Sequence, residues 1–470
     1  MFNDYRKFLS VIAGLILVVI AIVFFKERAG FSDTPAYVVG MTCNKGFFIA
    51  HNRYVIIGCE WLPYLFLKAG MRLKAIALGY SLGHTLFPVI LAAICLFVFR
   101  QPQKSLAIML FWVIMSRELF YYPVSEFQMG MGLLLFYDSY LDNTINKPKS
   151  SNLFLLLSLI ILPTIIFSHP IMILVFIAWV IYRVIKNNKP SKSIAGLIIV
   201  VAMISYAIKR LFFESGYEVT KMPSVTQVIE GLSKGVHYPL GTSFYEYIMA
   251  HEFIAPILFL ITLFVLLLSK KFGIAAYLLL VVAGFVSLIL LLFGAENNAY
   301  DHYFEHLLQP SIFFIVLILT DNLDNVVRSN ILKLIVGLGV FIIAIVKIID
   351  QGNVHIARQE WYLHKFRIMD QCGIRKAIVL RDELPSDMNK GSFWNSSYET
   401  MLLSSMEGSQ KTKTIFLSWG TAEEQAIKDG DEHTVVFDGH NERIDTYPSK
   451  YYNLGKEKYS IIRNDQCIKR

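Results

Sequence analysis

Charged residues are scarce in this chain. Only 17% of its 470 residues are Asp, Glu, Lys or Arg, whereas 55% are hydrophobic. Soluble domains have about 25% charged and about 45–50% apolar residues. This imbalance argues against a soluble enzyme, a disordered protein and a fibrous repeat. It favours a protein embedded in a membrane.

Long basic runs and the common catalytic motifs are also missing. The formal net charge is only +8, and no run resembles a nucleic-acid patch, so we expect no nucleic-acid partner. There is no Walker loop, no Gly-x-Ser-x-Gly, no His-Glu-x-x-His and no Cys-x-x-Cys. No His/Cys spacing resembles a zinc site, and no repeat has a solenoid period. Function must therefore be sought in the distribution of polar residues around apolar segments.

Apolar segments dominate the first three quarters of the chain. A helix needs about 20 apolar residues to cross a bilayer. The sequence predicts a polytopic all-α membrane bundle of about eleven helices, at 9–25, 75–99, 105–121, 126–141, 153–167, 169–186, 194–212, 251–269, 272–293, 304–320 and 331–349. The first segment lacks a small-residue cleavage site, so we interpret it as an anchor and not as a signal peptide.

The basic residues of the short loops predict the orientation of the bundle. Arg6 and Lys7 favour a cytoplasmic N-terminus, because cytoplasmic loops are enriched in Lys and Arg. Alternation then assigns the loops at 26–74 and 213–250, and the tail at 350–470, to the outer side. We therefore expect a membrane domain at 1–349 and an extracytoplasmic domain at 350–470.

The two large outer parts have different compositions. The first loop mixes apolar and aromatic residues with single charges, which is typical of short helices lying in the membrane interface. The tail predicts a small α/β domain, with a helix at 394–406 and strands at 376–380, 414–419, 434–439 and 459–464.

Four of the five cysteines fall on the predicted outer side. In an oxidising compartment they could form two disulfides, with Cys43–Cys59 and Cys372–Cys467 as the pairs, or remain four free thiols. Cys95 lies in the second predicted span.

Asp33 is the first candidate for chemistry. It lies shortly after the first helix, in Ser-Asp-Thr-Pro-Ala-Tyr. A carboxylate held just outside the bilayer can accept a proton from an attacking hydroxyl, and desolvation would raise its pKa towards a useful range. The alternative is structural, because Asp before Thr-Pro is also a fair helix N-cap.

A second acidic group surrounds the turn after the third predicted span. Arg117 and Glu118 are adjacent, so on a helix they would point about 100° apart and need not pair with each other. Tyr121, Tyr122 and Glu126 follow. The alternative is an interfacial ion pair within an aromatic belt.

Histidines and further cations complete the candidates. Asp301 with Glu305, and His302 with His306, are i,i+4 pairs that could bind a divalent metal, although helix starts often carry acids. His169 lies in a turn that faces the same compartment. An anionic headgroup would need cations, for which the candidates are Arg53, Arg117, Lys209 and Arg210. The last two could instead snorkel from their helix to the interface.

Together these features resemble the GT-C superfamily of integral-membrane glycosyltransferases. The resemblance rests on the topology of residues 1–350 and on Asp33 to Tyr37, which look like the family's Asp-x-x-x-Tyr pattern. It implies an inverting sugar transfer from a polyprenyl-phosphate donor to a lipid or glycan acceptor, in the inner membrane of a bacterium. Asp33 would be the base, and Glu118 or Glu126 the second acidic position. Arg53, Arg117 or Arg210 would hold the phosphate, and Tyr37, His169 and His302 would line the pocket.

Three other classes remain open. A transporter or flippase usually has related halves and helices broken at mid-membrane, and we find no clear inverted repeat. An envelope glycan polymerase typically has its large loop late in the chain, whereas here the first loop and the tail are large. A non-catalytic scaffold that displays 350–470 predicts no cavity at the outer mouth.

Overall fold

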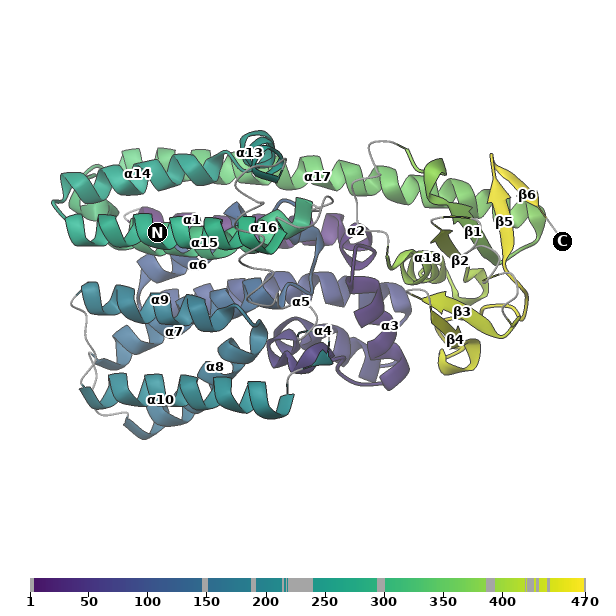
Figure 1. Ribbon diagram of the computed structural model, residues 1–470, viewed down its shortest axis with the longest axis horizontal. Coiled ribbons are helices and arrows are strands. Elements are labelled where there is room, and N and C mark those ends of the chain that lie inside the picture. Colours follow the sequence, from purple (N-terminus) through teal and green to yellow (C-terminus); the bar gives the residue numbers. More distant parts are fainter. Residues whose placement is uncertain are drawn as a thin grey trace.

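The computed structural model describes residues 4–145, 151–186, 192–213, 240–293, 301–385, 394–418, 431–437 and 440–468, with isolated positions 215, 216, 218, 420 and 427 between them. The long helices run side by side in one bundle, and the C-terminal α/β domain lies at one end of it (Figure 1). Three short helices of the first loop, α2, α3 and α4, lie at that same end.

Each predicted span coincides with a helix, but the helices differ in length. Six of those in the described part are long and apolar enough to cross a membrane, and a bent pair raises the number to seven. These findings indicate a multi-pass membrane protein and leave the count of eleven unconfirmed. The six are α1 (Tyr5–Val23), α5 (Leu73–Ala93, continued to Val98), α10 (Lys192–Ile208, continued to Phe213), α15 (Phe272–Phe293), α16 (Asp301–Asn322) and α17 (Asn330–Cys372).

The remaining helices of the bundle are shorter, less apolar or bent. The bent pair is α13 (Leu240–His251) with α14 (Ile254–Leu268), which meet at 83°. The shorter apolar helices are α6 (Pro102–Ile114), α8 (Ser151–Ser168) and α9 (Met172–Ile185), and α7 (Glu126–Ile145) carries several polar residues. Most of the loop predicted at 213–250 lies outside the described residues.

The centre of the bundle is built around α6, in which every residue from Lys104 to Ile114 is buried. This helix packs against α1, α5, α7, α16 and α17. The peripheral helices instead leave large apolar side chains exposed, such as Val19, Phe264 and Leu280. In water such surface would be costly, whereas lipid solvates it, so the pattern agrees with a membrane environment.

The first loop folds into short helices, as predicted: α2 (Phe25–Ala29), α3 (Thr34–Asn44) and α4 (Ile57–Lys68), with single 3₁₀ turns at Ala50–Asn52 and Tyr54–Ile56. Helix α4 folds back on α5 with very close backbone contact. An added Cβ at Gly83 would lie 2.0 Å from the carbonyl oxygen of Cys59, so only glycine fits there. The close contact fixes the loop against the bundle.

Helix α17 joins the bundle to the C-terminal domain without a break. It begins where the Ser329 side chain accepts a hydrogen bond from the Leu332 N–H, and it ends at Gly373 in the left-handed conformation. Its 43 residues span about 65 Å, roughly twice the hydrocarbon core of a bilayer. The predicted junction at 349–350 therefore lies inside a continuous helix.

The C-terminal domain holds a four-stranded sheet in the order β2-β1-β5-β6. Strands β1 (Lys376–Leu380), β2 (Thr414–Ser418) and β5 (Ser460–Arg463) are parallel, and α18 (Ser396–Ser405) packs against β2. Strands β3 (Thr434–Phe437) and β4 (His440–Arg443) form a separate antiparallel pair. The four predicted strands and the predicted helix are confirmed.

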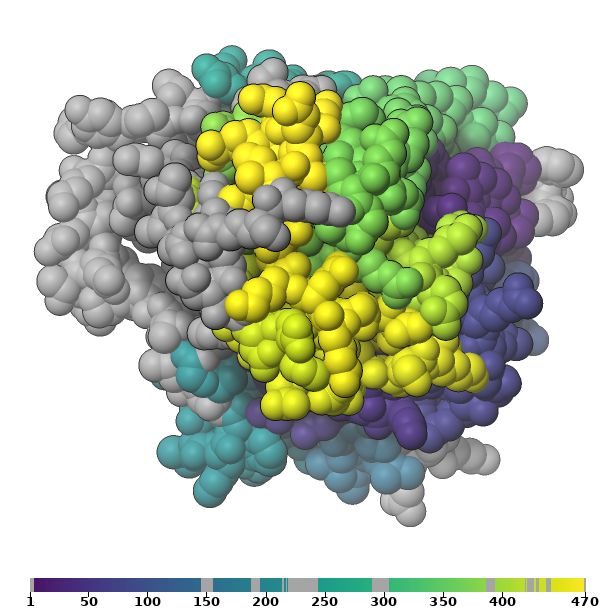
Figure 2. All heavy atoms as spheres, turned by 90° about the vertical axis from the view of Figure 1, so that its right-hand side faces the viewer, coloured from purple at the N-terminus to yellow at the C-terminus, as the bar shows by residue number. Residues whose placement is uncertain are grey.

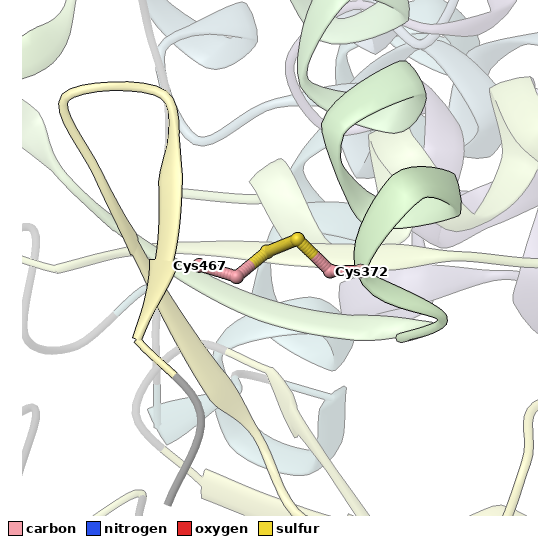
Figure 3. Close-up of a disulfide and its surroundings, with 2 residues drawn as sticks. All are labelled: Cys372 and Cys467. Atoms are coloured by element: carbon pink, nitrogen blue, oxygen red, sulfur yellow. A yellow bond between two sulfur atoms is a disulfide. The ribbon is translucent and has the colours of Figure 1, made fainter.

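Strand β6 (Gln466–Ile468) was not predicted. It pairs with β5 through a two-residue turn in which Asn464 and Asp465 both have positive φ, as such hairpins require. Cys467 on β6 forms a disulfide with Cys372 at the end of α17 (Figure 3). Cys43 and Cys59 are free thiols, so of the two alternatives left open for this pair the disulfide is not formed.

The C-terminal domain is docked on the end of the bundle by specific contacts. Figure 2 looks onto this end, where residues of the domain lie in front of the first-loop helices. The Lys450 ammonium donates to the Gly70 carbonyl at 2.9 Å, and the hydroxyls of Thr42 and Tyr452 lie 3.3 Å apart. Helix α18 also packs against α3. The domain therefore covers the helix that begins beside Asp33.

Candidate active site beneath the C-terminal domain

Asp33 occupies the N-cap position of α3 but does not cap the helix. Its carboxylate accepts hydrogen bonds from the hydroxyl of Tyr122 and, at 3.4 Å, from that of Ser32. Ser32 has φ of 53°, a left-handed conformation that is uncommon for serine. The structural alternative foreseen for Asp33, a capping bond, is therefore not made, and the side chain faces a polar cluster.

Tyr37 lies one helical turn after Asp33, on the same face of α3, and its hydroxyl donates to Glu126 Oε1 at 2.8 Å. Glu126 opens α7, so this bond joins the first loop to the bundle. Arg53, from the 3₁₀ segment after α3, lies 3.5 Å from Glu126 Oε2. The three predicted site residues Asp33, Tyr37 and Glu126 thus belong to one cluster.

Two cations meet one carboxylate at the edge of this cluster. Glu218 Oε1 lies 3.3 Å from Arg53 Nε and 3.4 Å from Lys209 Nζ. The Lys209 ammonium also donates to the Phe167 carbonyl at 3.2 Å. All three charged side chains are largely buried, but Arg210, the neighbouring candidate, is exposed.

Burial raises the pKa of Asp33 to about 6, and the nearby Glu126 carboxylate adds to this effect, although the Tyr122 hydrogen bond and Arg53 oppose it. The residue itself keeps partial exposure. A carboxylate with this pKa is ionised at neutral pH yet is more basic than an ordinary aspartate. The cluster therefore combines a proton acceptor with two cations that suit an anionic group.

Arg117 and Glu118 belong to a different cluster, nearer α17. Glu118 Oε1 accepts from the Gln351 amide at 2.6 Å, and Glu118 Oε2 lies 3.6 Å from His355 Nε2. Glu305 accepts the backbone N–H groups of both Glu118 and Leu119, each at 2.9 Å. These bonds fix the turn between α6 and α7. The structure thus joins Glu126, but not Glu118, to the Asp33 cluster.

The structure describes the side chain of only one of the two predicted histidines. The His169 ring packs on Phe127 and lies 5.5 Å from the His306 ring. Its pKa is lowered by burial, with Arg53 adding to the effect. The side chain of His302 lies outside the described residues. Within the described part, no three His, Cys, Asp or Glu residues are grouped to hold a metal ion.

Other buried polar residues hold the segment that leads to Asp33. Arg28 donates to the Ser81 carbonyl and the Thr85 hydroxyl, at 3.2 and 3.1 Å, and its guanidinium lies 3.8 Å above the Phe120 ring. Burial lowers the pKa of this arginine to about 9. Arg28 therefore anchors the first loop to α5 and to the turn after α6.

Sequence reasoning missed three residues of this site. Glu218 falls in the range predicted from the sequence as a loop, 213–250, which has no recognisable motif, and Asn395, whose amide donates to the Ser32 carbonyl at 2.9 Å, is 363 positions away from its partner. Glu60 bonds the Tyr80 hydroxyl and the Phe48 N–H, and burial raises its pKa to about 8. The only sequence signal that could have identified any of the three is a charged residue inside an apolar helix, and only Glu60 shows it.

Fold and site together describe a multi-pass helical membrane protein with a carboxylate-and-cation cluster beneath a C-terminal α/β domain. Comparisons with protein-family models, with curated proteins and with solved structures found no match.

Proposed function

We propose that this chain is a membrane glycosyltransferase that moves a sugar from a polyprenyl-phosphate donor to an acceptor hydroxyl. The observation that carries the proposal is the position of Asp33, which accepts a hydroxyl hydrogen bond from Tyr122 beside the buried cation Arg53. A group in this setting can take a proton from an O–H donor while a nearby cation holds an anionic leaving group.

Arg53 and Lys209 are the cations assigned to the donor phosphate. Both contact Glu218, which keeps them together, and both lie at the same edge of the cluster. Arginine can bind a phosphate through two parallel hydrogen bonds, and lysine adds a point charge. The proposal replaces the predicted Arg210 by Lys209 and assigns no donor contact to Arg117.

The transfer itself is a single displacement. Asp33 removes the proton of the acceptor hydroxyl, and the oxygen forms a bond to the anomeric carbon from the face opposite the phosphate. The bond from the anomeric carbon to the phosphate oxygen breaks, and polyprenyl phosphate leaves with the bonding electrons. Configuration inverts at that carbon.

The proposed location is the inner membrane of a bacterium, with a cytoplasmic N-terminus and the C-terminal domain outside. Two observations support this orientation. The basic residues of the short loops favour it, and the Cys372–Cys467 disulfide suits an oxidising compartment. The site would then lie at the outer face of the inner membrane, where polyprenyl-linked sugars are used.

Replacing Asp33 by Asn tests the proposal, because the amide keeps the size of the side chain and cannot act as a base. We expect loss of at least a hundredfold in sugar transfer from undecaprenyl-phosphate donors in membranes, with normal protein level. Asp350→Asn, at an exposed position of α17, is the matched control. Full transfer activity of Asp33→Asn would disprove the role of Asp33.

A transporter is the second candidate, and one observation favours it. The 83° bend between α13 and α14 resembles the broken helices of transporters. A transporter would move a labelled polyprenyl-linked sugar across the membrane of proteoliposomes without forming a glycosidic bond. That result, with unchanged transport by Asp33→Asn, would favour this candidate over the transferase.

A further inference from the structure

A cavity of about 450 Å³ lies between part of helix α3 and the C-terminal domain. Its walls come from parts of the chain that are about 400 residues apart, so it exists only because the domain is docked on the bundle. The cavity is lined by Ala36, Val39, Gly40, Cys43, Phe48, Tyr398, Glu442, Arg443, Thr446 and Tyr447.

The wall on the bundle side is apolar and is one face of α3. Ala36, Val39, Gly40 and Cys43 follow the i, i+3, i+4, i+7 spacing of a helix face. Phe48 closes this wall by packing directly on Gly40, where an added Cβ would lie 2.4 Å from the ring. The wall thus offers a flat apolar surface to a ligand.

The opposite wall is polar and carries both signs of charge, from Glu442 and from Arg443, whose guanidinium lies 3.1 Å from Asp445. The hydroxyls of Tyr398 and Tyr447 both donate to Oε2 of Glu442, and these two hydroxyls lie 3.0 Å apart. Glu442 Oε1 has no partner within the described part of the chain. Glu442 is half-buried, and its second carboxylate oxygen can accept hydrogen bonds from a ligand.

We propose that this cavity binds sugar units of the acceptor, next to the unit that reacts. A pyranose presents C–H groups on its face and hydroxyls around its edge, which match the apolar wall and the Glu442 side respectively. Glu442 and Arg443 both line this wall, so neither charge dominates, which suits an uncharged sugar. The inference rests on the proposed transferase function, because it assigns the ligand to the acceptor.

The position of the cavity relative to Asp33 supports this assignment. Ala36 lies less than one turn after Asp33 on α3, and one turn of helix is about 5 Å long. Phe48 packs with its ring 5.2 Å from that of Tyr37, whose hydroxyl contacts Glu126. Sugar units in the cavity would thus hold the acceptor within reach of Asp33. The binding energy of the units that do not react would position the hydroxyl that does.

Cys43 provides a built-in reporter of occupancy. It lines the cavity and is partly exposed, whereas the other free thiols, Cys59 and Cys95, are buried. Labelling of the full chain in nanodiscs with N-ethylmaleimide would be followed by mass spectrometry, with Cys43→Ser to identify the signal. The probes are maltotriose, mannotriose, diacetylchitobiose and a glucosamine disaccharide, each at millimolar concentration.

We expect at least one probe to slow the labelling of Cys43 severalfold. Glu442→Gln and Tyr447→Phe should remove this protection, because the first replaces the carboxylate by an amide and the second removes a hydroxyl that donates to Glu442. Glu407→Gln, an exposed acid just after α18, should retain it. Absence of protection by every probe, or protection that survives both cavity variants, would overturn the inference.

The outcome is separable from that of the proposed function. Asp33→Asn should abolish sugar transfer but keep the protection of Cys43, because Asp33 does not line the cavity. Loss of transfer in Asp33→Asn without any protection by the sugars would overturn the cavity assignment alone. Full transfer in Asp33→Asn would overturn the transferase role of Asp33, whatever the labelling shows.

Discussion

The side-chain amide of Asn395 donates a hydrogen bond to the carbonyl of Ser32 at 2.9 Å. Asn395 precedes α18 in the C-terminal domain, and Ser32 precedes Asp33 in the first loop. Both residues are buried, and Ser32 has a left-handed backbone that this bond helps to hold. The C-terminal domain therefore contributes directly to the backbone conformation beside the candidate base.

Asn395→Ala should misplace Asp33 while the protein remains folded. Loss of one buried hydrogen bond costs about 1 kcal/mol, which the fold tolerates, but the left-handed turn at Ser32 loses its partner. We expect a fall of about tenfold in the rate of sugar transfer, with little change in the Michaelis constant for the donor. Asn453→Ala, which removes an exposed bond to Gln410 in the same domain, is the control. An unchanged rate would contradict the positioning role.

The raised pKa of Asp33 predicts a pH dependence of activity and stability. Sugar transfer should rise with pH to a plateau above about 6, where the carboxylate becomes ionised. Infrared difference spectra, with Asp33→Asn as the reference, should show a carboxyl group that titrates near the same pH. A carboxyl band that disappears near pH 4 would contradict the prediction.

Stability should change in the opposite direction. Between the ordinary value of 3.8 and about 6, the folded chain holds this proton more tightly than the unfolded chain does. Stability contributed by Asp33 is therefore lost as pH rises through that window, by at most about 3 kcal/mol. Thermal melts should show a corresponding decline for the wild type that is absent in Asp33→Asn.

The Cys372–Cys467 disulfide predicts a defined thiol count. Denatured, unreduced protein should react with three maleimides, and reduced protein with five, since one bond and three free thiols are present. Cys467→Ser should lower the free energy of unfolding of the C-terminal domain by about 2–4 kcal/mol, because the bond closes a long loop. Cys59→Ser serves as the control for the count. Five reactive thiols in unreduced protein from intact cells would argue against an oxidising compartment.

We predict a large loss of stability when Lys104, at the opposite end of the bundle, is replaced. Its ammonium lies 2.6 Å from Asp138 and 3.0 Å from Asp321, and all three side chains are almost fully buried. Lys104→Met should lower stability by about 3–5 kcal/mol, because two buried carboxylates lose their shared partner. Lys26→Met, which breaks an exposed pair with Glu407, should cost less than about 1 kcal/mol. Similar melting temperatures for the two variants would contradict this assignment.

Local patterns predicted much of the fold. Apolar runs correctly indicated a helix at each predicted range, and β-branched runs such as 376–380 indicated the strands of the C-terminal domain. Boundaries were less predictable where a helix continued into polar sequence. The apolar sequence stops near residue 350, but helix α17 continues to Cys372, because its polar second half packs against the sheet. The change in composition therefore lies inside the helix and does not mark its end.

The candidate site was predicted only in part. Asp33, Glu126 and Arg53 were identified because ionisable residues beside apolar helices often mark functional sites, and Tyr37 was identified through the resemblance to the GT-C pattern. The division between Glu118 and Glu126 was not predictable, because it depends on the turn that ends α6 at Ile114 and directs the two acids to different neighbours. Cys43 and Cys59 fell on the predicted outer side, but topology says nothing about the distance between two sulfur atoms.

Hydropathy and residue order by themselves determined that this is a helical membrane chain with an early acidic motif and an α/β tail, because helix formation and burial in lipid depend on local periodicity and composition. Tertiary packing alone decided that Asn395 contacts Ser32, that Lys209 and Arg53 share Glu218, and that a cavity opens between α3 and Glu442. Such contacts join residues far apart in the chain, and their formation depends on how rigid elements dock, which no short stretch of sequence encodes.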